Sequence, residues 1–230
     1  MKRRHLLLAL VASCAGVSLH AADPNAPIRE SDYTAPIKVA CVGDSITEGA
    51  GLPDRKTQAY PAQLQRLLGD KWLVGNFGRS ARTLLNAGDF PYQTTGPLKE
   101  ALAFEPDVVI IMLGTNDSKP QNWKFKDNFV GDYKDLIGKF RALESKPRIF
   151  VCRPAPVVGE ERFTIRKRVV EEEMPLIAQV AKEEQTGVID MHAALERHPE
   201  LLPDGVHPNA AGAALLAKAA YRSLTGRLPD

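Results

Sequence analysis

The stretch Val108-Val109-Ile110-Ile111-Met112-Leu113-Gly114-Thr115-Asn116-Asp117 sets six apolar residues directly before a glycine and three polar residues. Such a run, mostly β-branched, is typical of a parallel strand that is buried on both faces. Glycine lets the backbone turn sharply and lets amide groups approach a ligand. The stretch therefore predicts a central strand that ends in a functional loop.

Other short apolar runs along the chain have the same character, and longer amphipathic runs separate them. The short runs cover residues 37–42, 72–74, 148–152 and 188–189. The amphipathic runs cover residues 60–68, 97–104, 129–143, 174–184 and 210–224. In the run 129–143, apolar residues recur at helical spacing, as expected for a helix that packs on a core. Five strands alternating with helices predict an open, doubly wound α/β fold with a parallel sheet.

The residues before the first strand divide into two parts. Lys2, Arg3 and Arg4 precede an apolar run and then small residues up to Ala22, so we expect residues 1–22 to be a cleavable export signal. A lipoprotein signal, with Cys14 lipidated as an anchor, is the alternative. Residues 23–36 are rich in proline and polar residues, which predicts a flexible leader. Residues 37–230 are expected to form a single domain, located in the periplasm or outside the cell.

Charge and cysteine content limit the partners and the chemistry. Without Lys2, Arg3 and Arg4, the 30 Lys and Arg residues fall to 27 against 28 Asp and Glu residues. This balance gives no reason to expect a nucleic acid or a stable membrane partner, unless Cys14 is lipidated. Cys41 and Cys152 lie in apolar runs, and a strand between them would hold them roughly 9–10 Å apart, too far for a disulfide. We expect two buried free thiols.

Polar residues cluster where the predicted strands end. Ligands of open α/β sheets bind beyond the carboxyl ends of the strands, and Ser45, Gly78 and Asn116 each follow one of these ends. The segment Asp204-Gly205-Val206-His207-Pro208 returns the chain to the same edge before the last helix. An aspartate three residues before a histidine can bond to Nδ1–H and leave Nε2 to accept a proton from serine. Ser45, Asp204 and His207 are therefore the predicted catalytic residues.

Taken together, these segments resemble the blocks of the SGNH hydrolases, also called the GDSL family. The four matching blocks, within residues 37 to about 225, are Gly43-Asp44-Ser45-Ile46-Thr47-Glu48-Gly49, Gly78, Gly114-Thr115-Asn116-Asp117 and Asp204-Gly205-Val206-His207. The resemblance implies a flavodoxin-like three-layer αβα sandwich and ester hydrolysis through an acyl-enzyme. It also implies an oxyanion hole made by the Ser45 amide, the Gly78 amide and the Asn116 side chain.

Charged residues near these blocks are candidates for substrate binding. After Gly78, the chain carries Arg79 and Arg82 where many relatives have small residues, so two arginines could narrow the site or bind an acidic substrate. Arg153 and Asp44 are further candidates, although Asp44 could instead bond to the loop backbone. The plainer alternatives are that Ser45 only caps a helix, that Gly78 and Asn116 only form turns, and that the arginines are solvated.

The motifs of other enzyme classes are absent from the sequence. It contains no phosphate-binding loop, no dinucleotide-binding glycine motif, no His-Glu-x-x-His and no Cys-x-x-Cys, so we expect neither a cofactor nor a metal. The sequence most resembles exported bacterial carbohydrate O-acetylesterases, which implies a small-molecule or glycan ester as substrate. A lysophospholipase or thioesterase is the alternative, and a non-catalytic glycan-binding protein is a third hypothesis. Trp123 and Phe125 could anchor a loop or support a sugar ring, and the oligomeric state stays open.

Overall fold

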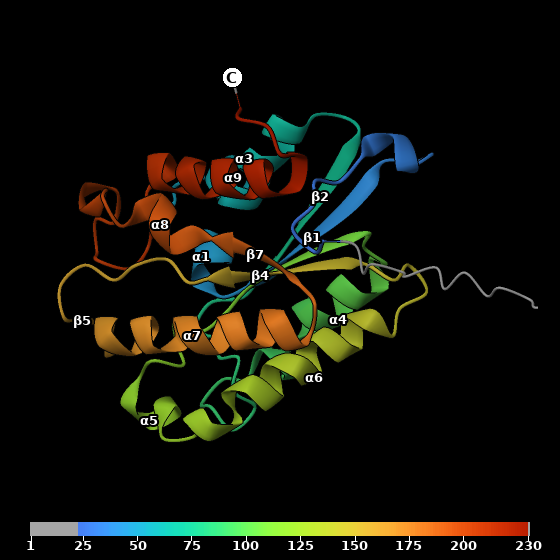
Figure 1. The fold of residues 1–230 in the computed structure, drawn as a ribbon. Helices are drawn as coiled ribbons and strands as arrows, with labels where there is room; N and C mark the ends of the chain where they lie inside the picture. The colour runs from blue at the N-terminus through green and yellow to red at the C-terminus, as the bar shows by residue number, and fades with distance from the viewer. Residues whose placement is uncertain (1–22, 230) are drawn as a thin grey trace, which may run out of the picture.

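A computed structural model describes residues 23–229, in which a parallel sheet of five strands forms the centre of the domain (Figure 1). The strands follow the order β2-β1-β3-β4-β7, and each neighbouring pair is parallel. This is the flavodoxin-like order, so the predicted fold class is confirmed. The predicted export signal and Cys14 lie outside the described residues. The strands of the sheet are β1 (Ile37–Gly43), β2 (Trp72–Gly78), β3 (Val108–Met112), β4 (Arg148–Arg153) and β7 (Gly187–Asp190).

Helices cover both faces of the sheet and give the domain three layers (Figure 1). The helices α3 and α9 lie on one face, and α4, α6 and α7 lie on the other. Side chains alternate along each strand, so Val39 and Cys41 enter the first core while Ala40 and Val42 enter the second. The helices are α1 (Ser45–Glu48), α2 (Arg55–Gln58), α3 (Tyr60–Leu68), α4 (Gly96–Ala103), α5 (Pro120–Trp123), α6 (Phe129–Arg141), α7 (Lys167–Glu183), α8 (Met191–Leu195) and α9 (Ala210–Thr225). Among residues 23–229, no helix combines the length and the apolar character that crossing a membrane requires.

Two elements between β4 and β7 differ from the sequence-based expectation. A two-stranded antiparallel hairpin, β5 (Glu161–Arg162) and β6 (Ile165–Arg166), precedes α7. The helix α7 itself begins at Lys167, although the sequence pattern placed its start at residue 174. Pro175 explains this difference, because proline favours the first turn of a helix but here lies inside it.

The segment 23–36 packs against the domain and is not a flexible leader. Ile28 is buried, and its amide donates a hydrogen bond of 2.7 Å to the carbonyl of Leu224 at the end of α9. The guanidinium of Arg148 donates to the carbonyls of Pro24 and Ala26 at 2.9 and 2.7 Å. One apolar anchor and one half-buried cation therefore hold a stretch whose composition alone indicated flexibility.

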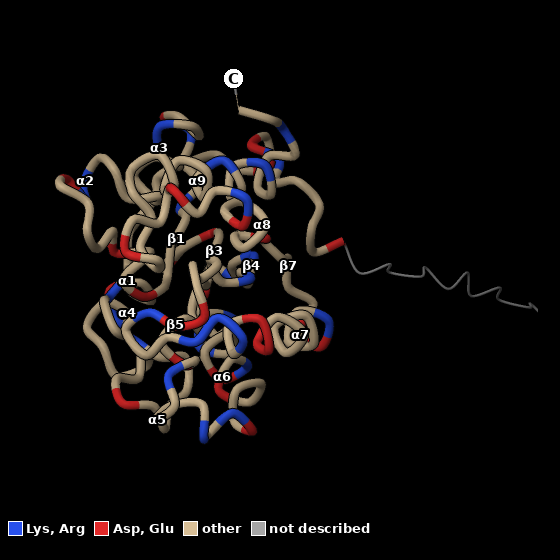
Figure 2. Tube along the Cα trace, turned by 90° about the vertical axis from the view of Figure 1, so that its left-hand side faces the viewer, with Lys and Arg blue, Asp and Glu red and all other residues tan. Residues whose placement is uncertain are grey.

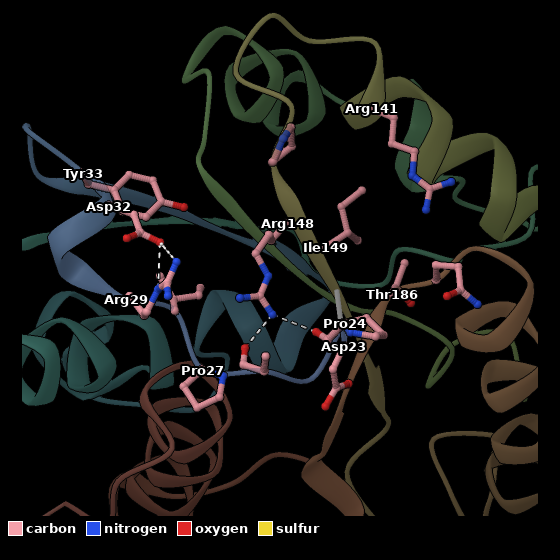
Figure 3. Close-up of a pocket in the computed structure, with 14 residues that line it drawn as sticks. Asp23, Pro24, Pro27, Arg29, Asp32, Tyr33, Arg141, Arg148, Ile149 and Thr186 are labelled. Carbon is pink, nitrogen blue, oxygen red and sulfur yellow. Dashed lines mark hydrogen bonds and ion pairs between the residues drawn. The ribbon is translucent and has the colours of Figure 1, made fainter. Parts of the chain in front are cut away.

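A cavity of about 830 Å³ lies between this segment and the amino ends of β4 and β7 (Figure 3). Tyr33, Arg148 and Thr186 are among the residues that line it, and an ion pair between Arg29 and Asp32 closes one side. None of the predicted site residues lines this cavity. It lies at the opposite edge of the sheet from the predicted catalytic residues.

Both cysteines of the described residues are buried free thiols, as predicted. Cys41 lies on β1 and Cys152 on β4, and β3 runs between them. Burial raises the pKa of the Cys41 thiol to about 12. The strand order and the predicted state of the thiols are therefore confirmed.

Candidate active site

Ser45 is the first residue of α1, and only Asp44 separates it from the end of β1 at Gly43. Asp44 caps this helix, since its Oδ1 accepts the Ile46 amide at 2.9 Å. A Cβ on Gly43 would clash with Thr47 and lie 2.6 Å from the Met112 carbonyl. Only glycine therefore allows the turn that carries Ser45 to the sheet edge. The capping role considered for Ser45 belongs to Asp44, and this leaves the Ser45 hydroxyl for other contacts.

The loop between η4 (Pro199–Leu201) and α9 holds Asp204 and His207 in a fixed relation. Oδ1 of Asp204 accepts the amides of Val206 and His207 at 2.9 and 2.7 Å, and Oδ2 lies 2.7 Å from His207 Nδ1. Partial burial opposes ionisation, but the hydrogen bonds from His207 and Val206 outweigh it and lower the pKa of Asp204. Asp204 is therefore an ionised acceptor, and Nδ1 of His207 carries the proton.

The opposite ring nitrogen of His207 meets the serine. His207 Nε2 lies 2.9 Å from Ser45 Oγ. Because Nδ1–H donates to Asp204, Nε2 can accept the hydroxyl proton of Ser45. The structure thus brings Ser45, His207 and Asp204 together in the hydrogen-bonded chain that a serine nucleophile requires.

Asn116 lies at the same edge, in the loop that follows β3, and hydrogen bonds fix its position. The side-chain Nδ2 of Asn116 donates to the Arg82 carbonyl at 3.2 Å, and the backbone carbonyl of Asn116 accepts from Asn122 Nδ2 at 2.9 Å. An amide nitrogen has two protons, so Nδ2 keeps a second one for a ligand. For the Ser45 amide, no acceptor is found in residues 23–229. Both groups can therefore donate to an oxyanion, the role that the family resemblance gives them.

Gly78 ends β2 against the backbone of α1, but its amide is engaged elsewhere. A Cβ at this position would clash with Glu48 and lie 2.6 Å from the carbonyl carbon of Thr47, so only glycine fits. The Gly78 amide donates to Asn76 Oδ1 at 2.9 Å, and Asn76 Nδ2 donates to the Thr47 carbonyl at 2.8 Å. To donate to an oxyanion, Gly78 would have to give up Asn76. Its role in the oxyanion hole stays a prediction.

Beneath these residues lie three buried carboxyl groups. Burial raises the pKa of Asp44 to about 6 and that of Asp117 to about 7, although Asp117 accepts the amides of Leu84 and Leu85. Glu173 on α7 is also fully buried, and neither of its carboxyl oxygens has a hydrogen-bond partner within residues 23–229. Burial, followed by repulsion from Asp117 and Asp44, raises the pKa of Glu173 well above its usual value. Its buried position therefore favours the neutral form of the Glu173 carboxyl group.

The three candidate substrate-binding arginines differ in their surroundings. Arg79 is exposed, Arg82 lies over the ring of Phe90 at 5.2 Å, and Arg153 pairs with Asp190 at 2.7 Å. Asp44 is buried and caps α1, which favours the structural role considered for it. A substrate role of Arg79, Arg82 and Arg153 stays untested. Trp123 is buried against Phe129, so it anchors its loop and offers no surface to a sugar.

The hairpin of β5 and β6 brings a residue to the site that the sequence did not single out. Figure 2 looks onto this edge and shows β5 between α1 and α7, with acidic and basic segments on either side. At the tip of the hairpin, Phe163 is 60% exposed, and its ring centre lies 6.2 Å from that of His207. The segment carries no glycine or asparagine at its turn, so the usual hairpin signal is missing. In residues 23–229 no cluster of three or more His, Cys, Asp and Glu side chains could hold a metal ion.

Comparison with known proteins identifies the same family that the four sequence blocks resemble. Residues 41–215 match the GDSL-like lipase/acylhydrolase family. An acetylxylan esterase of Xylanibacter ruminicola is 42% identical over 200 residues, which cover 79% of this chain and 42% of that protein. An acetylxylan esterase of Geobacillus stearothermophilus is 30% identical over 139 residues, which cover 55% of this chain and 63% of that protein. This chain therefore spans about half the length of these curated relatives.

Solved structures share the fold at lower identity. A carbohydrate acetylesterase from Sinorhizobium meliloti superposes with a TM-score of 0.67 at 23% identity, and covers 80% of this chain and 96% of its own. An aryl esterase from M. smegmatis gives a TM-score of 0.65 at 21% identity, with coverage of 81% and 97%. These similarities support the three-layer fold described above.

Proposed function

Because this chain belongs to the GDSL-like lipase/acylhydrolase family, a family of ester hydrolases, we propose that it removes short acyl groups, acetyl above all, from carbohydrates through an acyl-enzyme on Ser45. One observation carries the proposal. Asp204 Oδ2, both ring nitrogens of His207 and Ser45 Oγ form a continuous chain with distances of 2.7 and 2.9 Å. This chain can take the proton from a serine hydroxyl as the oxygen attacks a carbonyl carbon.

In the first half of the reaction, Ser45 Oγ forms a bond to the ester carbonyl carbon and its proton moves to His207 Nε2. The bond between that carbon and the alcohol oxygen then breaks, and Nε2–H gives its proton to the leaving oxygen. Asp204 stays ionised and stabilises the imidazolium that forms between these steps, because its pKa is lowered. The products of this half are the free alcohol and an acyl group on Ser45.

Negative charge develops on the former carbonyl oxygen during both halves. In this scheme the Ser45 amide and the second proton of Asn116 Nδ2 donate to it, and Gly78 joins them if its amide leaves Asn76. In the second half, His207 Nε2 takes a proton from water, and the oxygen of that water attacks the acyl carbon. The bond to Ser45 Oγ breaks, the proton returns to the serine, and a carboxylic acid leaves. No cofactor enters this scheme.

The choice of an acetylated carbohydrate has two supports. Both curated relatives are named acetylxylan esterases, and a solved neighbour of the same fold is named a carbohydrate acetylesterase. The loop of residues 118–128 after β3 is mostly polar, and its Trp123 is buried, so it supplies no apolar lid for a long acyl chain. Each methylene that is buried contributes about 0.8 kcal/mol, and a long chain would gain little of this here.

The test is a comparison of acyl length and of alcohol. We expect kcat/KM for p-nitrophenyl esters to fall from acetyl to butyryl to octanoyl, and acetate to be released from acetylated xylo-oligosaccharides. The Ser45→Ala variant is the control for contaminating esterase. Rising kcat/KM with acyl length would contradict the acetylesterase proposal and favour a lysophospholipase or thioesterase. Glycan binding without release of any acid would instead indicate a non-catalytic binding protein.

A further inference from the structure

The exposed aromatic ring of Phe163 lies next to the reacting residues. Four large hydrophobic side chains of the described residues are exposed, namely Leu73, Phe90, Phe163 and Leu228. Of these, Phe163 is the one whose ring centre lies 6.2 Å from that of His207, with an angle of 45° between the rings. Arg82 covers Phe90. Phe163 therefore presents an uncovered aromatic surface beside the catalytic histidine.

The backbone holds Phe163 in a conformation that its side chain disfavours. Arg162 pairs with Ile165, so Phe163 and Thr164 form a two-residue turn, and their φ angles are +53° and +62°. A turn with both φ angles positive normally uses Asn and Gly, and a bulky or β-branched residue there is a true outlier. Strain of this kind clusters at ligand-binding and catalytic sites, where the surroundings enforce it.

Contacts at the base of the hairpin enforce this conformation from the side of the catalytic loop. Ile165 is buried in a small cluster with Val157, Val170 and Val206, the last of which directly precedes His207. The Val158 amide donates to the Gly205 carbonyl at 2.8 Å. The side chain of Arg162 packs so closely on Gly205 that a Cβ there would lie 2.6 Å from Arg162 Cγ. The hairpin is therefore fixed to the loop that carries Asp204 and His207.

Further contacts fix the hairpin to the loop of Asn116. The Arg166 amide donates to Ser118 Oγ at 3.2 Å, and Arg166 Nε donates to the Ser118 carbonyl at 3.1 Å. Ser118 is two residues after Asn116 and is fully buried. Phe163 is thus held between the histidine loop and the loop of the oxyanion donor, and its position depends on both.

The reaction determines which part of the substrate meets Phe163. His207 Nε2 must come within hydrogen-bond distance of the leaving alcohol oxygen to protonate it. The leaving alcohol must therefore approach the imidazole, and Phe163 is the exposed aromatic side chain next to that ring.

The neighbours of Phe163 indicate the chemistry of that alcohol. Apart from the buried Ile165, the other residues of the hairpin are polar or charged, namely Glu161, Arg162, Thr164 and Arg166. A single aromatic face bordered by donors and acceptors suits a ring with an apolar C–H face and hydroxyls on its edge, because the negative face of an aromatic ring attracts C–H groups. A long alkyl chain would need a wider apolar surface.

We propose that Phe163 is a specificity residue whose ring supports the sugar ring of the leaving alcohol while His207 protonates its oxygen. This inference rests on the proposed function and adds to it the place of the sugar. It also explains why a strained turn without glycine is fixed at both sides to the catalytic loops.

The test uses two esters that form the same acetyl-enzyme. Acetylated methyl β-xylopyranoside has a sugar as its alcohol, and methyl acetate has an alcohol too small to reach Phe163. The variant Phe163→Asn removes the ring but suits positive φ angles, so it should fold at least as stably. Phe163→Tyr keeps the ring, and Leu228→Asn is a matched control on an exposed apolar residue of the C-terminal end.

For Phe163→Asn we expect kcat/KM for the sugar ester to fall about tenfold, the loss of an aromatic contact near the upper end of its usual strength. We expect less than about a twofold change for methyl acetate, because kcat/KM reports formation of the acetyl-enzyme and the departing methanol is too small to reach Phe163. Phe163→Tyr and Leu228→Asn should keep the wild-type ratio of the two esters. If Phe163→Asn were folded and active but kept the wild-type ratio of kcat/KM for the two esters, the proposed role of Phe163 would be refuted. A wild-type protein that hydrolyses neither ester would refute the proposed function instead.

Discussion

Acidic groups at the same edge of the sheet fall into two sets whose pKa values are shifted in opposite directions. We call Asp204 beside His207 the upper layer, and the three buried carboxyl groups the lower layer. In the upper layer, Asp204 is partly exposed and accepts three hydrogen bonds, so its pKa is lowered. In the lower layer, Asp44, Asp117 and Glu173 are buried, and their pKa values are raised. The upper layer therefore supplies one fixed negative charge to His207. In the lower layer, burial shifts each carboxyl group towards its neutral form.

This difference follows from the elements that hold each group. The Asp204 loop offers its own backbone amides to the carboxylate, because Gly205 at φ +86° lets the chain fold back on itself. Glu173 projects from α7 towards Gly114, where a Cβ would clash with its carboxyl oxygen, and no amide of residues 23–229 donates to it. Ionisation is stabilised in one case and costly in the other.

The largest effect should come from replacing Ser45, the proposed nucleophile of the upper layer. We expect Ser45→Ala to lower kcat for a short aryl ester by about 10⁴-fold or more, because no covalent intermediate can then form. The melting temperature should stay near that of the wild type, since Asp44 and not Ser45 caps α1. Substantial residual kcat in Ser45→Ala, with the fold intact, would show that another group performs the chemistry.

A smaller effect is expected at Asn116, which directly precedes Asp117 in the loop after β3. Asn116→Ala should lower kcat by about 10² to 10³-fold, the usual cost of one oxyanion donor. Asn86→Ala is the matched control, because Asn86 is exposed and contacts Asp132 away from the site. If only KM changed in Asn116→Ala, Asn116 would bind the ground-state substrate without stabilising the oxyanion.

The upper layer could be predicted from the sequence and the lower layer only in part. Gly43 and Ser45 follow an apolar run, and His207 stands three residues after Asp204. These relations are local in the sequence, so they can be recognised without knowledge of the fold. Glu173 follows Glu171 and Glu172 in a run that looks solvated, and only the path of α7 across the sheet buries it. The same holds for the hairpin, because the turn at Phe163 is imposed by contacts with residues far along the chain, such as Gly205 and Ser118.

The smallest effect, and the sharpest test of the lower layer, concerns the proton of Glu173. Above pH 4.5 the unfolded chain loses the proton of this carboxyl while the folded protein keeps it, because burial raises the folded pKa. The stability of the wild type should therefore fall as pH rises from about 4.5 towards the folded pKa. Below pH 4.5 both states are protonated, and this group adds no pH dependence. Glu173→Gln replaces the acid by a neutral group of the same shape and should remove the fall.

The measurement is the melting temperature of the wild type and of Glu173→Gln between pH 4.5 and 8. Each pKa unit of difference between folded and unfolded states is worth about 1.4 kcal/mol, and each kcal/mol moves the melting temperature by about 2–4 °C in a chain of this size. The advantage of Glu173→Gln should therefore grow with pH, against a background fall that Asp44 and Asp117 cause in both proteins. Glu171→Gln is the control, because Glu171 lies on the exposed face of α7 near Lys167. Its melting temperature relative to the wild type should not grow with pH. If the difference in melting temperature between the wild type and Glu173→Gln stayed constant over this pH range, Glu173 would have a partner that stabilises its charge. The contrast between the two layers would then not hold for this residue.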